Sequence, residues 1–310
     1  MPTAHSHHRQ HLRAIACALI GFACWVTADS FMKLAGASAV PKYELVAVGG
    51  GSGMATIFIL TFLRRRMDLF RTPHRLRFAM MAFCSAAGFL LYMTAVPLMP
   101  LANFYVIVFL MPLLLAILST LFLREPLSLK QWLAILAGFL GVLIAVNPAG
   151  LFDRPDLWRA DTAVAAGTLF IAVNVLNMRI LGPTASREAL AFYPRIGPFV
   201  GGLLAMLIWG AEAMPTRILV YALILGSIGG VGWMLVAQAY RLAPVGTVAP
   251  FQYSQILYGA VYGYFIWGDV PTWHVLVGGA IIIASGIYIL RHAHRSAERK
   301  FDLPEIEAAP

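Results

Sequence analysis

Long uninterrupted apolar runs are the feature that most constrains this chain. They recur along most of its 310 residues, and each has the roughly 17 to 24 residues that a helix needs to cross about 30 Å of hydrocarbon. They lack the alternation of apolar and polar residues that lipid-facing strands require. Because a helix satisfies its own backbone hydrogen bonds in lipid, the runs predict ten transmembrane helices. The runs lie at residues 14–34, 44–63, 78–97, 101–123, 131–147, 161–181, 189–209, 217–240, 246–267 and 272–290.

The composition excludes a soluble globular protein. Hydrophobic residues make up 60% of the chain and charged residues 12%, with a mean hydropathy of +0.77, so too few polar side chains are present to cover a water-exposed surface. The three cysteines, Cys17, Cys24 and Cys84, fall within predicted spans. They form neither a disulfide framework nor a zinc-ligand spacing, so no metal or cofactor is predicted.

The basic residues predict the orientation in the membrane. With a cytoplasmic amino terminus, most Lys and Arg residues fall in cytoplasmic segments, as the positive-inside rule requires. The predicted outer side holds only Lys33, Lys42, Arg154, Arg159 and Arg217. We therefore expect a multi-pass protein of the cell inner (cytoplasmic) membrane with both termini in the cytoplasm. This asymmetry accounts for the net charge of +9 without nucleic acid as a partner.

The two halves of the sequence resemble each other. Residues 21–36 align without gaps on residues 167–182, so that glycines, a methionine and a basic residue coincide, and nearly the same shift places Pro100 on Pro244 and Glu125 on Asp269. Five spans separate each aligned pair. Because five is odd, the second copy crosses the membrane in the opposite sense, as in the inverted repeats of secondary carriers.

The repeated motifs resemble a known family. The stretch from Pro100-Leu-Ala-Asn103 to Leu123-Arg124-Glu125-Pro126 is similar to the EamA module of the drug/metabolite transporter superfamily, and the stretch from Ala239 to Gly286 looks like a second such module. The resemblance implies an all-α integral membrane fold of ten transmembrane helices in two inverted five-helix repeats. It also implies transport of a metabolite. The family includes exporters of amino acids and importers of larger compounds such as flavins or S-adenosylmethionine.

The domain boundaries follow from the spans and the repeat. We expect a cytoplasmic tail at 1–13, a first repeat at 14–147, an extracytoplasmic connecting loop at 148–160, a second repeat at 161–290 and a cytoplasmic tail at 291–310. One feature departs from the family. Many relatives have an arginine in the second span, where this chain has glycines and a serine at 48–53, whereas the corresponding stretch of the seventh span keeps Arg195.

Arg195 is the leading candidate for solute binding. A charge inside a span costs about 2.5 to 3.5 kcal/mol on insertion scales, so it requires a partner or a cavity. Arg195 is interpreted either as a fork for a carboxylate or phosphate of the solute or as a structural ion pair or snorkelling side chain. The prolines Pro194 and Pro198 flank it, and they favour a helix opened toward a central space.

Other polar and aromatic residues within the spans complete the predicted site. Rings can stack on a planar solute and amides can hydrogen-bond it, although both also serve in helix packing. The predicted set is Trp25, Tyr92, Asn103, Asn174, Tyr193, Trp233, Gln252, Tyr253 and Gln255. Asp29 and Lys33 lie four residues apart on one helical face, so they are expected to pair with each other or to serve in ion coupling.

A secondary carrier is therefore the predicted function, with a small-molecule solute and the lipid bilayer as partners. We expect a monomer or a homodimer that moves an amphipathic, anionic or zwitterionic metabolite by alternating access. An intramembrane enzyme is one alternative, because residues 50–53 match the Gly-x-Ser-Gly string of rhomboid serine proteases; its only candidate histidine, His274, lies at a helix end. A channel is the other alternative. No nucleotide-binding motif is present, so gradients rather than ATP are expected to drive transport.

Overall fold

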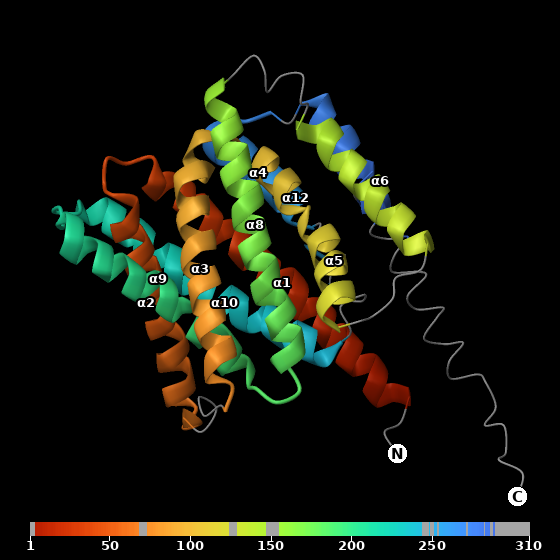
Figure 1. Cartoon of the computed structure of the whole chain (residues 1–310), viewed down its shortest axis with the longest axis horizontal. Coiled ribbons are helices and arrows are strands. Elements are labelled where there is room, and N and C mark those ends of the chain that lie inside the picture. Colours follow the sequence, from red (N-terminus) through yellow and green to blue (C-terminus); the bar gives the residue numbers. More distant parts are fainter. Residues whose placement is uncertain are drawn as a thin grey trace, which may run out of the picture.

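The computed structural model is a bundle of helices (Figure 1). Every regular element in the part of the chain that the structure describes is helical, as the apolar runs predict. The described residues are 4–67, 73–123, 129–146, 155–243, 248, 251–252, 254–270, 272–281, 283–285 and 288.

Six helices contain segments that are long and apolar enough to cross a membrane. They coincide with the predicted first, second, third, sixth, seventh and eighth spans, so the membrane-helix prediction is confirmed for these six. The helices are α1 (Ala4–Gly36), α2 (Lys42–Leu63), α3 (Arg75–Ala95), α8 (Pro155–Leu181), α9 (Arg187–Trp209) and α10 (Thr216–Leu242).

The remaining predicted spans correspond to shorter or interrupted helices. They are the 3₁₀ turn η2 (Val96–Leu98), α4 (Leu101–Val108), α5 (Met111–Leu123), α6 (Leu129–Val146), α12 (Ser254–Tyr262), the π-type turn η4 (Gly263–Trp267) and an apolar helix at Trp273–Ser285. The total of ten crossings therefore stays a prediction.

Local sequence explains two of the interruptions. The break between α4 and α5 comes just before Pro112, which lacks a backbone N–H and so starts a helix more easily than it continues one. The π-type turn η4 ends at Gly268, whose φ of +70° lies in the left-handed region that glycine adopts without steric cost. Both interruptions fall in spans that the repeat alignment pairs with each other, the fourth and the ninth.

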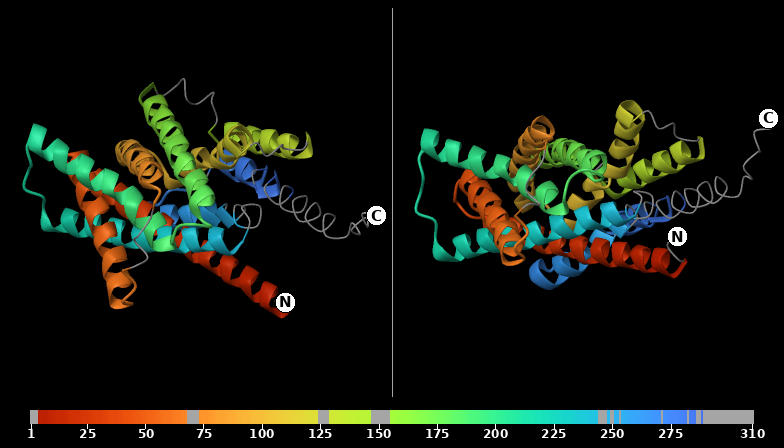
Figure 2. Two further views of the ribbon diagram at one scale, coloured as in Figure 1. Left: turned by 60° about the horizontal axis from the view of Figure 1, so that its bottom comes forward. Right: turned by 90° about the horizontal axis from the view of Figure 1, so that it is seen from below.

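The long helices pack in a pattern that repeats between the halves. α1 lies along α10, and α3 lies along α8; α2 packs against α9 and α10, and α3 also packs against α9. In Figures 1 and 2, α6 and the segment that contacts it through Gly138 and Ser285 lie to one side of these helices. The first three spans of each half thus interlock with those of the other half.

Two helix crossings are built from aligned glycines. A β-carbon placed on Gly232 of α10 would lie 3.0 Å from the carbonyl oxygen of Gly21 on α1. A β-carbon placed on Gly88 of α3 would lie 3.3 Å from the carbonyl oxygen of Gly167 on α8. The alignment that places Gly21 on Gly167 also brings Gly88 close to Gly232, so the same type of crossing occurs twice. Small residues are what allow backbones to approach this closely.

The glycine-rich stretch of α2 fits between α9 and α10. A β-carbon on Gly50 would lie 2.7 Å from the backbone nitrogen of Phe199 on α9, and one on Gly53 would lie 2.8 Å from the carbonyl oxygen of Gly226 on α10. The stretch that departs from the family pattern is therefore the surface through which α2 contacts both neighbouring helices. A larger side chain at either position would push the two halves apart.

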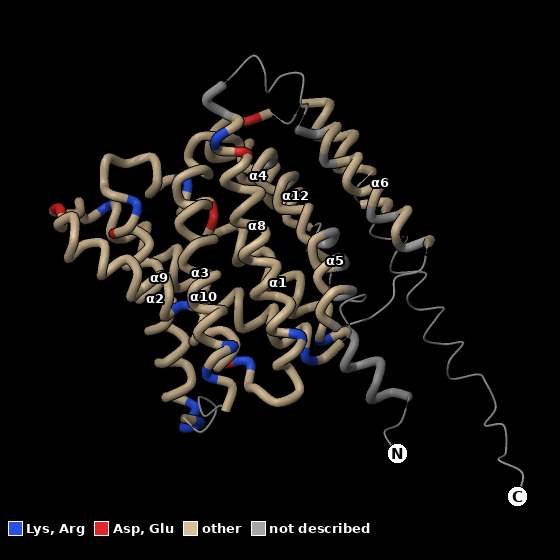
Figure 3. Tube along the Cα trace, in the orientation of Figure 1, with Lys and Arg blue, Asp and Glu red and all other residues tan. Residues whose placement is uncertain are grey.

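Charged residues gather mainly toward the ends of the helices, and the middles of most helices are apolar (Figure 3). This distribution fits a chain whose helix centres lie in hydrocarbon, where a charge is costly. The predicted orientation, with both termini in the cytoplasm, stays a prediction.

The adjacent glycines of α9 provide a matched test of the helix contacts. A β-carbon on Gly202 would lie 2.6 Å from the carbonyl oxygen of Tyr43 on α2, whereas one on Gly201 would meet only the β-carbon of Ala86, at 3.9 Å. We expect Gly202→Ala to destabilise the protein by about 1–3 kcal/mol, as overpacking does. Gly201→Ala is expected to leave stability unchanged or raise it slightly, because alanine favours a helix. Thermal unfolding in detergent measures both, and equal midpoints would contradict the contact.

Candidate functional site

A cavity lies among the helices where the two halves meet. The space enclosed by its walls, together with the open space at its mouth, is about 860 Å³. Residues from α1, α2, α3, α4, α5, α8, α9, α10 and α12 line it. They are Trp25, Ala28, Asp29, Met32, Gly50, Ser85, Phe89, Tyr92, Phe104, Tyr105, Val108, Met111, Ile171, Ala191, Pro194, Arg195, Pro198, Leu225, Gly229, Trp233 and Gln255.

The lining follows the internal repeat. The alignment of the halves pairs several lining positions with one another, so that equivalent points of the two repeats face the same space. The aligned lining pairs are Trp25 with Ile171, Ser85 with Gly229, Phe89 with Trp233, and Met111 with Gln255. Both repeats therefore line the cavity, and carriers built from inverted repeats hold their solute at such an interface.

Arg195 is the main positive charge of the cavity. It extends from α9 beside Pro194, is 8% exposed, and its guanidinium lies between Gly53 of α2 and Gly229 of α10. A β-carbon on Gly53 would lie 2.5 Å from Nη1 of Arg195, so the glycine leaves the room that the side chain occupies. Nε of Arg195 has no hydrogen-bond partner, and within the described part of the chain no carboxylate forms an ion pair with the guanidinium.

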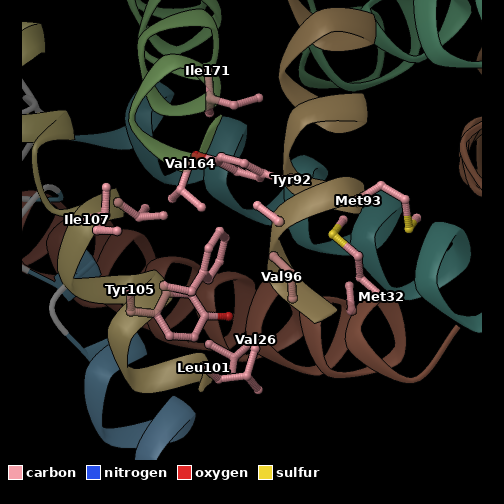
Figure 4. Close-up of a cluster of buried hydrophobic side chains, with 14 of the residues drawn as sticks. Val26, Met32, Tyr92, Met93, Val96, Leu101, Tyr105, Ile107, Val164 and Ile171 are labelled. Atoms are coloured by element: carbon pink, nitrogen blue, oxygen red, sulfur yellow. The ribbon is translucent and has the colours of Figure 1, made fainter. Parts of the chain in front are cut away.

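Asp29 supplies a carboxylate to the same cavity from α1. Its Oδ2 accepts a hydrogen bond from the hydroxyl of Tyr105 on α4 at 2.7 Å. Tyr105 itself is buried beside Val26 and Leu101 in the large hydrophobic cluster drawn in Figure 4. Helix α1 also contacts α12, where the hydroxyls of Thr27 and Tyr262 lie 3.1 Å apart. Polar contacts thus tie α1 to both shorter helices near the cavity.

The expected pairing of Asp29 with Lys33 is not what the structure shows. The amine of Lys33 lies 3.1 Å from Oδ2 of Asp269, just after η4, and 4.4 Å from the ring centre of Trp267. Asp29 and Lys33 do lie four residues apart on α1, but Lys33 pairs with Asp269 and Asp29 accepts a hydrogen bond from Tyr105. Lys33 therefore joins the end of α1 to the end of η4, and Asp29 remains at the cavity.

Aromatic rings form much of the cavity wall. Trp25 and Trp233 have ring centres 4.9 Å apart with their planes tilted by 48°, and Phe104 packs edge-to-face on Tyr92 at 5.0 Å. Besides Nε of Arg195, two buried polar atoms of the described lining residues lack hydrogen-bond partners: Nε1 of Trp25 and Oε1 of Gln255. Buried polar atoms normally have partners, so these atoms are available to a solute or to water.

The structure brings six of the predicted site residues together at the cavity. They are Trp25, Asp29, Tyr92, Arg195, Trp233 and Gln255. Tyr193 instead packs on Phe78 with ring centres 4.7 Å apart, and Nε2 of Gln252 contacts the sulfur of Met111 at 3.4 Å. The binding role of each residue stays a prediction.

Two further predicted residues, Asn174 and Asn103, do not line the cavity. Asn174 is fully buried in α8, and neither atom of its side-chain amide has a hydrogen-bond partner. Asn103 lies on α4 but does not line the cavity, and Tyr253 falls outside the described residues.

Several lining residues were not among the predicted site residues. Phe89, Phe104 and Tyr105 have no charge or unusual spacing that marks them as lining residues rather than packing residues. The repeat alignment does contain a usable signal for one of them, since it pairs Phe89 with Trp233. The contact of Tyr105 with Asp29 could be found only from the structure, because it depends on how α4 meets α1.

The comparisons with known proteins identify the family. The model of the EamA-like transporter family matches residues 12–147 and 158–291, once in each half of the chain. The chain belongs to the EamA-like transporter family. This confirms the predicted resemblance, and membership of a transporter family argues against the serine-protease alternative.

Curated relatives of this EamA protein are named as metabolite transporters. It is 26% identical over 202 residues to an S-adenosylmethionine uptake transporter of Rickettsia bellii (strain RML369-C), covering 65% of this chain and 67% of the relative. It is 28% identical over 193 residues to a riboflavin transporter of Vibrio cholerae, covering 61% and 62%. A riboflavin transporter of Rhizobium johnstonii is 25% identical over 250 residues, covering 80% and 81%. The chain is thus a multi-pass membrane transporter for a small molecule.

One solved structure shares the fold. It is described only as a crystal structure of protein, and it has a TM-score of 0.67 and 18% sequence identity. The match covers 91% of this chain and 98% of that one. At this identity the likeness concerns the arrangement of the helices alone.

The Lys33–Asp269 pair can be tested by exchanging its charges. Lys33→Asp or Asp269→Lys alone places two like charges together at a partly buried contact, with side chains 12% and 31% exposed in the native pair. We expect each single variant to lose about 1–3 kcal/mol of stability, between the values for exposed and buried pairs. The double variant should recover most of that loss in thermal unfolding.

Arg75→Asp, at an exposed position, is the control and should change stability little. If the double variant were no more stable than the weaker single variant, the two charges would not be interacting.

Proposed function

We propose that this EamA protein is a gradient-driven carrier that moves a small amphipathic metabolite across the cytoplasmic membrane of a bacterium by alternating access. The solute combines a planar part with an anionic group, alone or as one end of a zwitterion. The observation that carries the proposal is the guanidinium of Arg195, which lines the central cavity and forms no ion pair within the described part of the chain.

The state of Arg195 favours ligand binding over a structural role. A buried charge without a partner is costly, and a permanent structural arginine is expected to have a carboxylate beside it. A carboxylate or phosphate on the solute would satisfy the guanidinium by two parallel hydrogen bonds, which arginine provides and lysine does not. Gly53 and Gly229 border the guanidinium, so α2 and α10 leave room for the arginine side chain at the cavity.

The aromatic lining supports a planar part of the solute. Trp25, Trp233 and Phe89 surround the space with rings, and flat ring systems gain from stacked or edge-to-face contacts with such walls. Nε1 of Trp25 can donate a hydrogen bond and Oε1 of Gln255 can accept one. A heterocycle with both donors and acceptors at its edge fits this pair of unsatisfied atoms.

The names of the relatives agree with the planar part of the proposed solute. S-adenosylmethionine and riboflavin, which name the relatives, both contain a planar heterocycle; the first also carries a carboxylate and the second carries no anionic group. They are therefore a suitable pair of probes for the role of Arg195.

The repeat supports alternating access. The cavity lies between two halves that contact each other through equivalent helices, so the halves can exchange conformations and open the cavity to either side in turn. The distribution of basic residues supports cytoplasmic termini.

Uptake into proteoliposomes tests the function. We expect radiolabelled S-adenosylmethionine to accumulate inside vesicles containing the wild-type protein, and its binding in a thermal-shift assay to weaken roughly tenfold or more in Arg195→Ala, because hydrogen bonds to charged groups contribute about 1.5–3 kcal/mol. Arg195→Lys should recover only part of the affinity. Riboflavin binding should change less, since riboflavin has no anion for Arg195 to hold.

The control is Arg217→Ala, which removes an exposed arginine at the start of α10. Equal loss of both probes in Arg195→Ala with a lowered melting temperature would show that Arg195 is structural. Absence of uptake for anionic, zwitterionic and neutral heterocycles alike would refute the carrier proposal.

A further inference from the structure

Asp29 is the second charged group of the cavity, and the contacts leave it without a cation. Lys33, four residues further along α1, forms an ion pair with Asp269 at 3.1 Å. Its hydrogen bond comes from the neutral hydroxyl of Tyr105 at 2.7 Å. Within the described part of the chain Asp29 forms no ion pair, with Arg195 or with any other base. The two opposite charges of the cavity are therefore held apart.

Aromatic rings accompany Asp29 on the cavity wall. Tyr92, Phe104 and Tyr105 form a continuous cluster, with ring centres 5.0 Å apart in both successive pairs. Trp25, one turn before Asp29 on α1, lines the same space. The faces of aromatic rings attract cations, and several rings beside a carboxylate are the arrangement by which proteins hold methylated cations.

Hydrogen-bond accounting selects the kind of cation. An ammonium group has three N–H donors that must find acceptors when it is buried. Around Asp29, Oδ2 already accepts from Tyr105, and the hydroxyl of Tyr92 is shared with Thr168 at 3.0 Å. Oδ1 of Asp29 and Oε1 of Gln255 remain as acceptors. The walls beside the carboxylate are mostly aromatic rings, however, and these favour a weakly hydrated cation over an ammonium that needs three acceptors. A sulfonium or quaternary ammonium group has no such donors.

We propose that Asp29 and the rings of Trp25, Tyr92, Phe104 and Tyr105 form a subsite for a weakly hydrated cation, a sulfonium or quaternary ammonium group. Tyr105 is a positioning residue as well as part of the wall, because its hydroxyl fixes the orientation of the carboxylate. The inference rests on the proposed function only in taking the central cavity as the solute site. Because Arg195 binds the anionic group of the solute and this subsite binds a cationic group, the proposed solute is a zwitterion.

A small probe tests the subsite without requiring transport. Choline carries a quaternary ammonium, and 3,3-dimethylbutan-1-ol has the same shape and hydroxyl but no charge. In thermal-shift titrations of the full-length protein we expect choline to bind and the alcohol to bind at least about tenfold more weakly. Asp29→Asn should weaken choline by about tenfold and leave the alcohol unchanged. Asp29→Glu should retain the preference for choline.

Two further variants separate the roles. Tyr105→Phe keeps the ring and removes the hydroxyl, so we expect a smaller loss of choline affinity than in Asp29→Asn. Asp161→Asn changes an aspartate of α8 that does not line the cavity, and choline affinity should stay at the wild-type value.

Equal binding of choline and the alcohol, or unchanged choline binding in Asp29→Asn, would overturn the subsite. Loss of proton-driven uptake in Asp29→Asn with choline binding retained would do the same and would assign Asp29 to ion coupling.

Failure of the subsite and failure of the proposed function give different results. S-adenosylhomocysteine lacks the methyl group and the sulfonium charge of S-adenosylmethionine but keeps its amine and carboxylate. If both are taken up equally by the wild type, with dependence on Arg195, the carrier proposal stands and the subsite is wrong. If no solute is taken up but choline binds in a manner that requires Asp29, the subsite stands and the carrier proposal fails.

Discussion

Close approach between helix backbones is the constraint on which this structure depends. Gly21 and Gly232 at one crossing, and Gly88 and Gly167 at its counterpart, let the backbones of α1 and α10, and of α3 and α8, approach each other closely. Between lipid-exposed helices the hydrophobic effect provides little attraction, so packing at short distance has to supply it. The crossings fix the positions of the long helices, and these positions determine where the cavity can exist.

The same constraint explains how the chain holds a charge at its centre. The glycines of α2 lie against α9 and α10, and Gly53 leaves the space that the guanidinium of Arg195 fills. An arginine in α2 itself would have no room in this packing. One helix, α9, thus supplies the charge, and its aligned partner, α2, supplies the space.

Much of the fold could be predicted because its causes are local or repeated. Apolar length predicted the six long helices, and the aligned glycines predicted that the halves would be equivalent. The pairing of Lys33 with Asp269 could not be predicted, since it depends on where η4 ends after Gly268, far along the chain from α1. Within the site, Arg195 and Asp29 could be identified from the sequence because a charge inside a membrane span is costly. The sequence does not distinguish Phe104 and Tyr105 from ordinary packing residues.

The unequal residues at equivalent positions have a consequence for how a solute moves. A perfectly duplicated cavity would offer two interchangeable poses, and a cargo could turn end over end between them. Here Trp25 aligns with Ile171 and Asp29 with Val175, so the near-symmetric framework encloses a polarised interior. In the alternating-access cycle that we propose, a cargo that matches this polarity would keep a single heading, and the same end of it would lead through the membrane on every passage.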